Sequence, residues 1–457
     1  MQPLRSERLT IVPVEPPAQA DLAPPNPIEL LRSRSYIVLL ILGAIVGIPV
    51  AAVAYFFLKL VGEAQSWLYQ SLPSDLGFNA TPSWWPLPLL IVGGAVVAAT
   101  IVYLPGNGGE EPSLGFHMSG PPVIVNLPGV LVASFATLAC GAVLGPEAPL
   151  IAIGGGVAVL ILKLIKSDAP AQAIVVIGAA GSFAAISTLL GSPLLGAFLL
   201  MEAVGIGGPL LGVILVPGLL AAGIGSLIFI GLDNLTGFGT FSLSVPDLPA
   251  FPSLNGVEFL WAIGIGLLAA LLGTSIKRGA QAIAPQVVKR RLLLTPTIGA
   301  LVALAAILFE QTTTHSAQDV LFSGENSLAP LLQHLSTWSW GALIMVVACK
   351  GIAYSLSMSA FRGGPVFPSM FIGAAGGAAL SHLGGLPMIA GAAMGIGAML
   401  VSILGLPFVS VLLTVVFLQA DGAKLTPLVI VAVVVAYVAS AWLAPTPKPV
   451  AANPEPS

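Results

Sequence analysis

Long runs of apolar residues without a single charge limit what this chain can fold into more than any other feature. A helix needs about 20 such residues to cross the roughly 30 Å hydrocarbon layer of a membrane. Only 8% of the residues are charged, whereas a soluble domain carries about a quarter. The sequence therefore predicts an all-α polytopic membrane protein, whose clearest spans are Tyr36–Leu58, Pro86–Leu104, Leu210–Gly231, Phe259–Thr274 and Leu425–Leu443.

Basic residues gather in two places, before the first apolar run and near the middle of the chain. Such clusters stay on the cytoplasmic side of a membrane, so the N-terminus is expected in the cytoplasm. A net charge of −3 favours no nucleic-acid partner. The residues in these clusters are Arg5, Arg8, Arg32 and Arg34, then Lys277, Arg278, Lys289, Arg290 and Arg291.

The chain divides into two hydrophobic halves that resemble each other. The phrase GPEAPLIAIG at Gly145–Gly154 returns as GPVFPSMFIG at Gly364–Gly373, and the Gly-x-Pro at Gly191 returns at Gly405. Paired segments interrupted by glycine and proline indicate a transporter built from repeats, with the binding site between them. We expect a disordered cytoplasmic tail at 1–35, membrane repeats at 36–232 and 255–443, a loop at 233–254 and a short tail at 444–457.

Each phrase has the chemistry of a helix start that binds an anion. Proline suits the first turn of a helix, because its missing N–H would have no partner there. The amides of Glu147, Ala148, Val366 and Phe367 would be left unpaired at membrane depth. An anion satisfies such amides and is attracted by the partial positive charge of a helix N-terminus. Two facing helix starts would hold a dehydrated anion without a lysine or arginine in either phrase.

Glu147 is the one acid in the two phrases. A carboxylate at a helix N-terminus occupies the place that an anion would take, and protonation would release it. Glu147 is therefore predicted to act as a gate, a proton carrier or both. The alternative is a carboxylate that caps its own helix. Glu202, the other acid deep in a predicted span, fits either a carboxylate bonded to a neighbouring segment or a proton relay.

At these residues the chain resembles the CLC family of chloride channels and chloride/proton exchangers, of the prokaryotic type without CBS domains. The resemblance rests on LPGVLVASFATLACGAVLGPEAPLIAIGGG (Leu127–Gly156), GSPLLGAFLLMEA (Gly191–Ala203) and GGPVFPSMFIGAAGG (Gly363–Gly377). It implies an inverted repeat of many tilted and broken transmembrane helices, and a homodimer with one pore in each subunit. It also implies a place in the plasma (inner) membrane of a prokaryote.

The resemblance further implies roles for single residues. Glu147 matches the family's external gating glutamate, and Asn107, in GNGGEEP, lies near the place of a pore serine. Val366 and Phe367 fall on backbone positions that line the central anion site. The whole set of expected anion-binding residues is Asn107, Gly145, Glu147, Ala148, Gly364, Val366 and Phe367.

Several positions depart from the family pattern. Pro146 and Pro365 each remove an amide donor, and Val366 stands where the family has a pore phenylalanine. Ala203 stands where exchangers often carry an internal proton glutamate. Tyr437 lies too early for the pore tyrosine and is interpreted as a packing or interfacial residue. These departures leave halide selectivity and proton coupling open.

We therefore predict transport of a small inorganic anion, chloride first, through a pore gated by Glu147. A proton-coupled antiporter is the alternative to an uncoupled channel. A transporter of organic anions fits less well, because no arginine in the phrases could pair a carboxylate. A non-transporting scaffold would leave Glu147 unexplained. An enzyme is not expected, since the four histidines are scattered without an H-E-x-x-H motif, and neither a cofactor nor a metal is expected.

Overall fold

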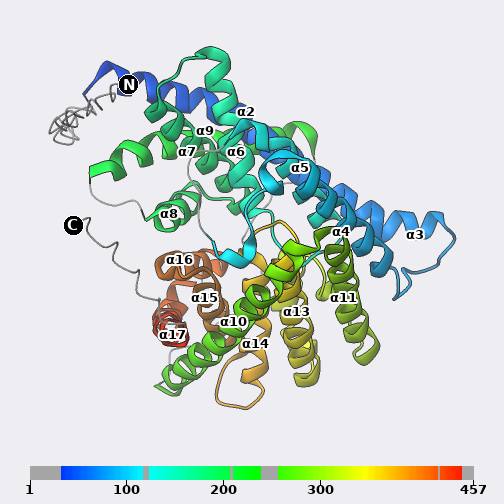
Figure 1. Ribbon diagram of the computed structural model, residues 1–457. Helices are drawn as coiled ribbons and strands as arrows, with labels where there is room; N and C mark the ends of the chain where they lie inside the picture. The colour runs from blue at the N-terminus through cyan, green and yellow to red at the C-terminus, as the bar shows by residue number, and fades with distance from the viewer. Residues whose placement is uncertain (1–31, 117–122, 206–208, 238–255, 420–421, 445–457) are drawn as a thin grey trace, which may run out of the picture.

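The computed structural model describes residues 32–116, 123–205, 209–237, 256–419 and 422–444, and most of them are helical (Figure 1). β-pairing among these residues is limited to one isolated bridge, between Gly145 and Gly364. The prediction of an all-α polytopic membrane protein is confirmed. Most of the predicted tails and of the loop between the repeats lies outside the described residues, so those boundaries stay predictions.

The helices fall into two series. The first contains α2 (Arg34–Ser66), a π-helical turn (Trp67–Ser71), α3 (Leu72–Asp75), α4 (Pro86–Tyr103), three 3-10 turns (Pro105–Gly108, Pro112–Leu114, Ile124–Asn126), α5 (Leu127–Ala139), α6 (Glu147–Ile165), α7 (Ala171–Leu190), α8 (Pro193–Val204) and α9 (Pro209–Thr236). The second contains α10 (Gly256–Lys289), α11 (Arg291–Thr312), a 3-10 turn (Ala317–Asp319), α12 (Glu325–Gln333), a 3-10 turn (Leu335–Thr337), α13 (Trp340–Ala360), α14 (Val366–Ser381), α15 (Met388–Leu404), α16 (Pro407–Phe417) and α17 (Gly422–Leu443).

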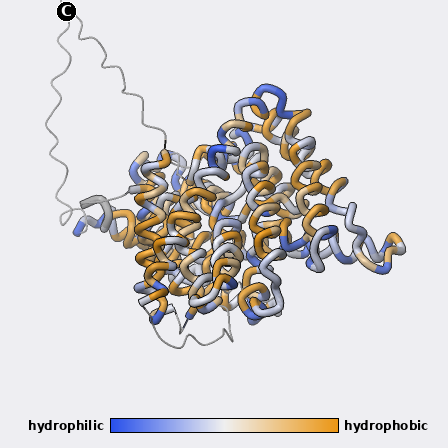
Figure 2. The backbone as a smooth tube through the Cα atoms, turned by 90° about the horizontal axis from the view of Figure 1, so that it is seen from below, coloured by the Kyte–Doolittle hydropathy of each residue, from blue (hydrophilic) through white to orange (hydrophobic). Residues whose placement is uncertain are grey.

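In the described part of the chain, 9 helices are long and apolar enough to cross a membrane, and several more are apolar but shorter. Hydrophobic residues cover the helices on the outside of the protein as well as inside (Figure 2). The run predicted at Phe259–Thr274 is the first part of α10, which continues to Lys289. With 34 residues at 1.5 Å each, α10 is about 51 Å long, so it must tilt to lie within a bilayer.

The two series pack their helices in the same way. α2 lies against α7 and α9, as α10 lies against α15 and α17, and α6 pairs with α7 as α14 pairs with α15. α7 and α15 both end at a left-handed glycine, Gly191 (φ 62°) and Gly405 (φ 72°). α8 and α16 then both begin at a proline, Pro193 and Pro407. The repeat predicted from the glycine and proline phrases is confirmed.

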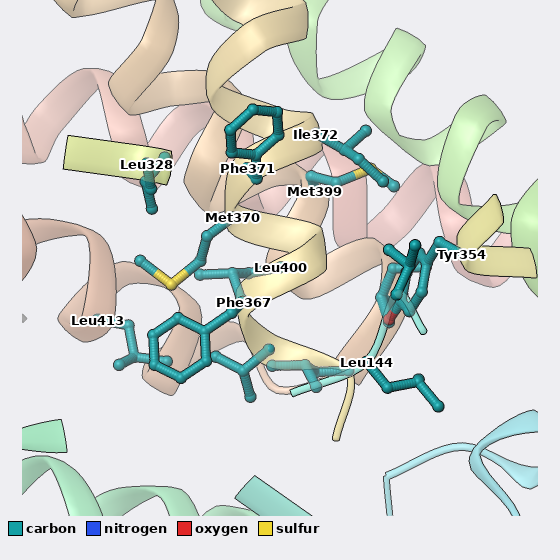
Figure 3. Packing of buried hydrophobic residues seen from close by; sticks show 14 of the residues in the cluster. Leu144, Leu328, Tyr354, Phe367, Met370, Phe371, Ile372, Met399, Leu400 and Leu413 are labelled. Carbon is teal, nitrogen blue, oxygen red and sulfur yellow. The ribbon is translucent and has the colours of Figure 1, made fainter. Parts of the chain in front are cut away.

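α14 lies at the centre of the protein. Gly373 and Gly377 of α14 face Gly391 and Gly395 of α15, and a Cβ on any of the four would collide with the backbone of the other helix. Small residues of this kind let membrane helices approach closely. Figure 3 shows α14 among buried side chains of α13, α15 and α16. Because α14 is buried along its length, its N-terminus lies deep inside the protein.

Candidate functional site

The two Gly-Pro phrases meet where α6 and α14 begin. The Gly145 amide donates to the Gly364 carbonyl at 2.8 Å, and the Gly364 amide donates to the Gly145 carbonyl at 2.6 Å. Pro146 and Pro365 follow this bridge as the N-cap residues of α6 and α14. α6 lies in the upper half of Figure 1 and α14 in the lower half. Both phrases therefore open a helix, as predicted, and both helices begin at the same place.

The Glu147 side chain reaches from the first repeat to the helix start of the second. It is 0% exposed, and its Oε1 accepts a hydrogen bond of 2.9 Å from the Phe367 amide. Its other oxygen, Oε2, has no hydrogen-bond partner among the described residues. The carboxylate lies over the glycine bridge, where a Cβ on Gly145 or Gly364 would collide with it. Glu147 thus occupies the N-terminus of α14 instead of capping only its own helix.

Few amides at this point remain for an anion. The prolines at the second and fifth positions of each phrase have no N–H, and the leading glycines use theirs in the bridge. Each helix therefore keeps two amides at its start, and Glu147 already takes the one of Phe367. The four amides are those that the sequence predicted, at Glu147, Ala148, Val366 and Phe367.

Apolar and aromatic side chains surround the start of α14 (Figure 3). Leu144 and Phe367 are buried there, and Tyr354 comes from α13. The Tyr354 hydroxyl donates to the Pro365 carbonyl at 3.0 Å, which fixes the turn before α14. Nothing in the sequence distinguishes Tyr354 from other aromatic residues of an apolar helix, so its place at the site could not be predicted. Tyr437 lies partly exposed on α17, which fits its interpretation as an interfacial residue.

Two cavities reach the residues around Glu147. One, of about 210 Å³, is lined by Pro146, and we call it the Glu325 cavity after an acid in its wall. The other, of about 360 Å³, is lined by Ala148, and we call it the Arg362 cavity. The residues directly before and after Glu147 line different cavities. Glu147 itself lines neither cavity, but its two neighbours in the chain connect it to both.

A buried arginine forms part of the wall of the Arg362 cavity. Arg362 is 2% exposed, and its Nε donates to the Asn107 carbonyl at 3.1 Å. Its Nη2 lies 3.2 Å from Oε1 of Glu111, and the same oxygen accepts from Nη2 of Arg291 at 2.8 Å. One carboxylate is thus shared by two positive charges beside the cavity.

Asn107 was predicted from the sequence to lie at the pore, whereas Arg362 was not. Asn107 is exposed and lines the cavity, in a left-handed conformation (φ 52°) that asparagine tolerates. Its role in a pore stays a prediction. Arg362 directly precedes GGPVFP, just outside the phrase. A lone charge in an apolar segment was the signal that could have found it, because such residues are functional by default.

Glu111→Gln is expected to destabilise the protein. Burial alone would raise the pKa of Glu111, but hydrogen bonds and charges from Arg291 and Arg362 outweigh it and lower the pKa. A carboxylate of this kind stabilises the fold above its ordinary pKa of about 4.3, and this contribution disappears as the pH falls through the lowered value. Because Glu111 is partly exposed, we expect a loss of about 1–3 kcal/mol at pH 7.

Thermal unfolding in detergent measures this loss, with Glu63→Gln as the control for removing an exposed acid. The melting temperature of wild type should decrease below about pH 4, and that of the Glu111 variant should decrease less over the same pH range. Equal melting temperatures for the Glu111 variant and the control would show that the shared carboxylate does not stabilise the fold.

A buried lysine holds the segment that leads to the Glu325 cavity. Lys350 of α13 is 0% exposed, and its Nζ donates to the carbonyls of Asp319, Val320, Leu321 and Phe322 at 3.0–3.3 Å. The amide of Phe322, whose φ is 58°, donates in turn to the Gly141 carbonyl at 3.1 Å. These contacts fix the chain just before α12.

Glu202 repeats the arrangement of Glu147 at a second helix. Its two oxygens accept hydrogen bonds from the amides of Phe408, at 3.0 Å, and Val409, at 2.7 Å. An acid of α8 therefore caps α16 of the second repeat. Of the two predictions for Glu202, the carboxylate bonded to a neighbouring segment is what the structure contains, and the proton relay stays a prediction.

A family model and a curated protein both match most of the chain. The family model described as "Voltage gated chloride channel" matches residues 116–441. The "Putative ion-transport protein YfeO" of Salmonella choleraesuis is 25% identical over 365 residues, which cover 78% of this chain and 84% of that protein.

Two solved structures share the fold of the chain. A slow cyanobacterial Cl⁻/H⁺ antiporter superimposes with a TM-score of 0.72 and 19% identity, over 89% of this chain and 94% of that one. A CLC-type fluoride/proton antiporter has a TM-score of 0.65 and 21% identity, over 88% of this chain and 95% of that one. The predicted inverted repeat of tilted and broken helices is thereby confirmed.

Proposed function

Because the chain belongs to the voltage-gated chloride channel family, we propose that it carries a small inorganic anion, chloride first, across a membrane along a route that Glu147 closes. One observation supports this most. The buried Glu147 carboxylate, whose neighbours Pro146 and Ala148 line two different cavities, accepts the Phe367 amide at the start of α14. It therefore occupies the amide that an anion at this helix N-terminus would take.

An anion and the ionised Glu147 compete for the same place. While Glu147 is bonded to Phe367, a second negative charge there meets a like charge at close range. When Glu147 takes up a proton and moves aside, the amides of Val366 and Phe367 are free for the anion, and Ala148 offers one from α6. Gly145 and Gly364 contribute by leaving room for the carboxylate.

The Arg362 cavity suits the approach of an anion. Arg362 supplies a full positive charge in its wall, and Asn107 lies at the same wall. Glu111 and the Asn107 carbonyl already engage the guanidinium. Arg362 therefore attracts an anion into the cavity without holding it tightly, which favours passage over binding.

Exchange of the anion against a proton is the second candidate, and the unpaired Oε2 of Glu147 favours it. A buried oxygen without a hydrogen-bond donor is costly when charged, and a proton on it removes that cost. Each release of Glu147 from Phe367 would then carry a proton. Both solved structures compared above are described as proton antiporters. Ala203, where exchangers often carry a second acid, favours the uncoupled channel instead.

We place the N-terminus and the Arg362 cavity on the cytoplasmic side. Arg291, which shares Glu111 with Arg362, belongs to the basic cluster Lys289–Arg291 between α10 and α11, and such clusters stay in the cytoplasm. The Glu325 cavity then opens to the outside. As the resemblance implies, we also propose that the protein is a homodimer in the plasma (inner) membrane of a prokaryote. Light scattering of the purified protein tests whether it is a dimer.

Purified protein in chloride-loaded liposomes tests the transport proposal. We expect chloride release above that of protein-free liposomes, read with a chloride electrode. A pH-sensitive dye inside the liposomes reports whether protons move in the opposite direction, which separates antiporter from channel. Replacing chloride by fluoride, bromide or nitrate then ranks the anions. If wild type and Glu147→Ala both release no anion under any gradient, the chain is not an anion transporter.

A further inference from the structure

Glu325 is an acid that the mechanism above does not use. It begins α12 and lines the Glu325 cavity, and its amide donates to the Ser323 hydroxyl at 3.2 Å. Pro146 lines the same cavity, and Glu147 follows Pro146 directly in the chain. The cavity therefore has one carboxylate in its wall and a second one immediately behind it.

Polar residues form part of the wall of the Glu325 cavity. Tyr69 and Gln70, in the π-helical turn Trp67–Ser71, line the cavity, and π-helical turns are frequent at functional sites. The Tyr69 hydroxyl donates to the Cys140 carbonyl at 2.7 Å. On the other side, the contacts of Lys350 fix the segment before α12. These contacts hold two parts of the cavity wall in place.

The electrostatics of Glu325 suit a group that gains and loses a proton near neutral pH. Glu325 is half-buried, and its loss of hydration, together with the negative charge of the nearby Glu147, raises its pKa to about 8. Lys350 is turned to backbone carbonyls and does not pair with Glu325. The charged or titratable groups on the elements around Glu325 are Lys59, Glu63, Tyr69, Cys140, Glu147, His315, Asp319, His334, Cys349, Lys350 and Tyr354.

We propose that Glu325 is a second proton-binding residue, which passes protons between the Glu325 cavity and Oε2 of Glu147. In this step the O–H bond of the Glu325 carboxyl breaks and the proton bonds to Oε2 of Glu147, which becomes neutral. Glu325, left ionised, takes its next proton from the solution that enters the cavity. Oε2 is the acceptor because it is buried without a partner, whereas Oε1 accepts from Phe367. The inference rests on the proposed function, in which Glu147 gains and loses a proton.

Infrared titration of the detergent-purified protein tests the coupling without any transport. The carboxyl band of Glu325 is identified by its loss in Glu325→Gln. Glu147→Gln should shift the titration midpoint of this band down by about one pH unit, because the negative charge of Glu147 that raises the pKa of Glu325 is gone. The control Asp75→Asn, which removes an exposed acid, should keep the wild-type midpoint. A midpoint that Glu147→Gln leaves unchanged overturns the proposal.

Liposomes then test the relay itself. Glu325→Gln should slow proton movement about tenfold, the factor that one pKa unit represents, and Glu325→Asp should restore most of it. In a Glu147→Ala background, Glu325→Gln should leave chloride release unchanged. If it slows chloride release there as much as in wild type, Glu325 acts on the anion route or the fold, and the relay is wrong. If no liposome releases chloride, the transport proposal fails, while the infrared result still decides the coupling.

Discussion

Glu147→Ala is expected to raise chloride release from liposomes about tenfold to a hundredfold at pH 8. A hydrogen bond to a charged group contributes about 1.5–3 kcal/mol, and every 1.4 kcal/mol is a factor of ten. The substitution removes the carboxylate that accepts from the Phe367 amide, next to the residues Pro146 and Ala148 that line the two cavities. Wild-type release should increase as the pH falls, because protonation removes the competing charge, and the variant should lose this dependence.

Two further variants make the Glu147 result decisive. Glu147→Gln keeps a side-chain oxygen for the Phe367 amide but cannot ionise, so it should lose the pH dependence with a smaller gain in release. Glu63→Gln, an exposed acid on α2, should behave like wild type. Melting temperatures of all three establish that each variant is folded. A Glu147→Ala protein that is folded, no faster than wild type and still pH-dependent would rule out Glu147 as the gate.

Lys350→Met is expected to cost about 3–5 kcal/mol of unfolding free energy, a large part of the stability of a protein. The lysine is 0% exposed, and its Nζ is the donor for four consecutive carbonyls, Asp319–Phe322. Methionine fills a similar volume but donates nothing, so the carbonyls lose their partner. The favourable contact of Nζ with the Phe371 ring, at 4.6 Å, is lost as well.

Thermal unfolding in detergent measures this cost, and Lys163→Met, at the exposed end of α6, is the matched control. The control should melt within a few degrees of wild type. Lys350→Arg should recover only part of the stability, since the larger guanidinium must fit the same enclosed space. If Lys350→Met melts with the control, the four carbonyl contacts do not stabilise this segment.

The sequence predicted best those features that depend on local chemistry. Proline and glycine act on their own backbone, so the phrases at Gly145 and Gly364 identified two helix starts and the repeat. The apolar runs identified the spans, but not their ends. α10 continues past Thr274 to Lys289, because a helix can extend beyond its uncharged residues.

What the sequence could not predict are the contacts between distant segments. The acid at Glu147 was found, but that it reaches α14 of the other repeat depends on the folded chain. The same holds for Glu202 and α16. Lys350 bonds only to backbone carbonyls, which any residue possesses, so its partners leave no trace in the sequence. The pore role of Asn107 and the homodimeric assembly stay predictions.

The way in which acids of one repeat cap helices of the other has a consequence for how the chain assembles. Two helix starts of the second half, those of α14 and α16, take a hydrogen-bond acceptor from an acid of the first half. If the chain is cut between α9 and α10, we expect these two helix starts to lack their acceptors until the two fragments are produced together. Such shared hydrogen bonds hold the two similar halves of the chain against each other.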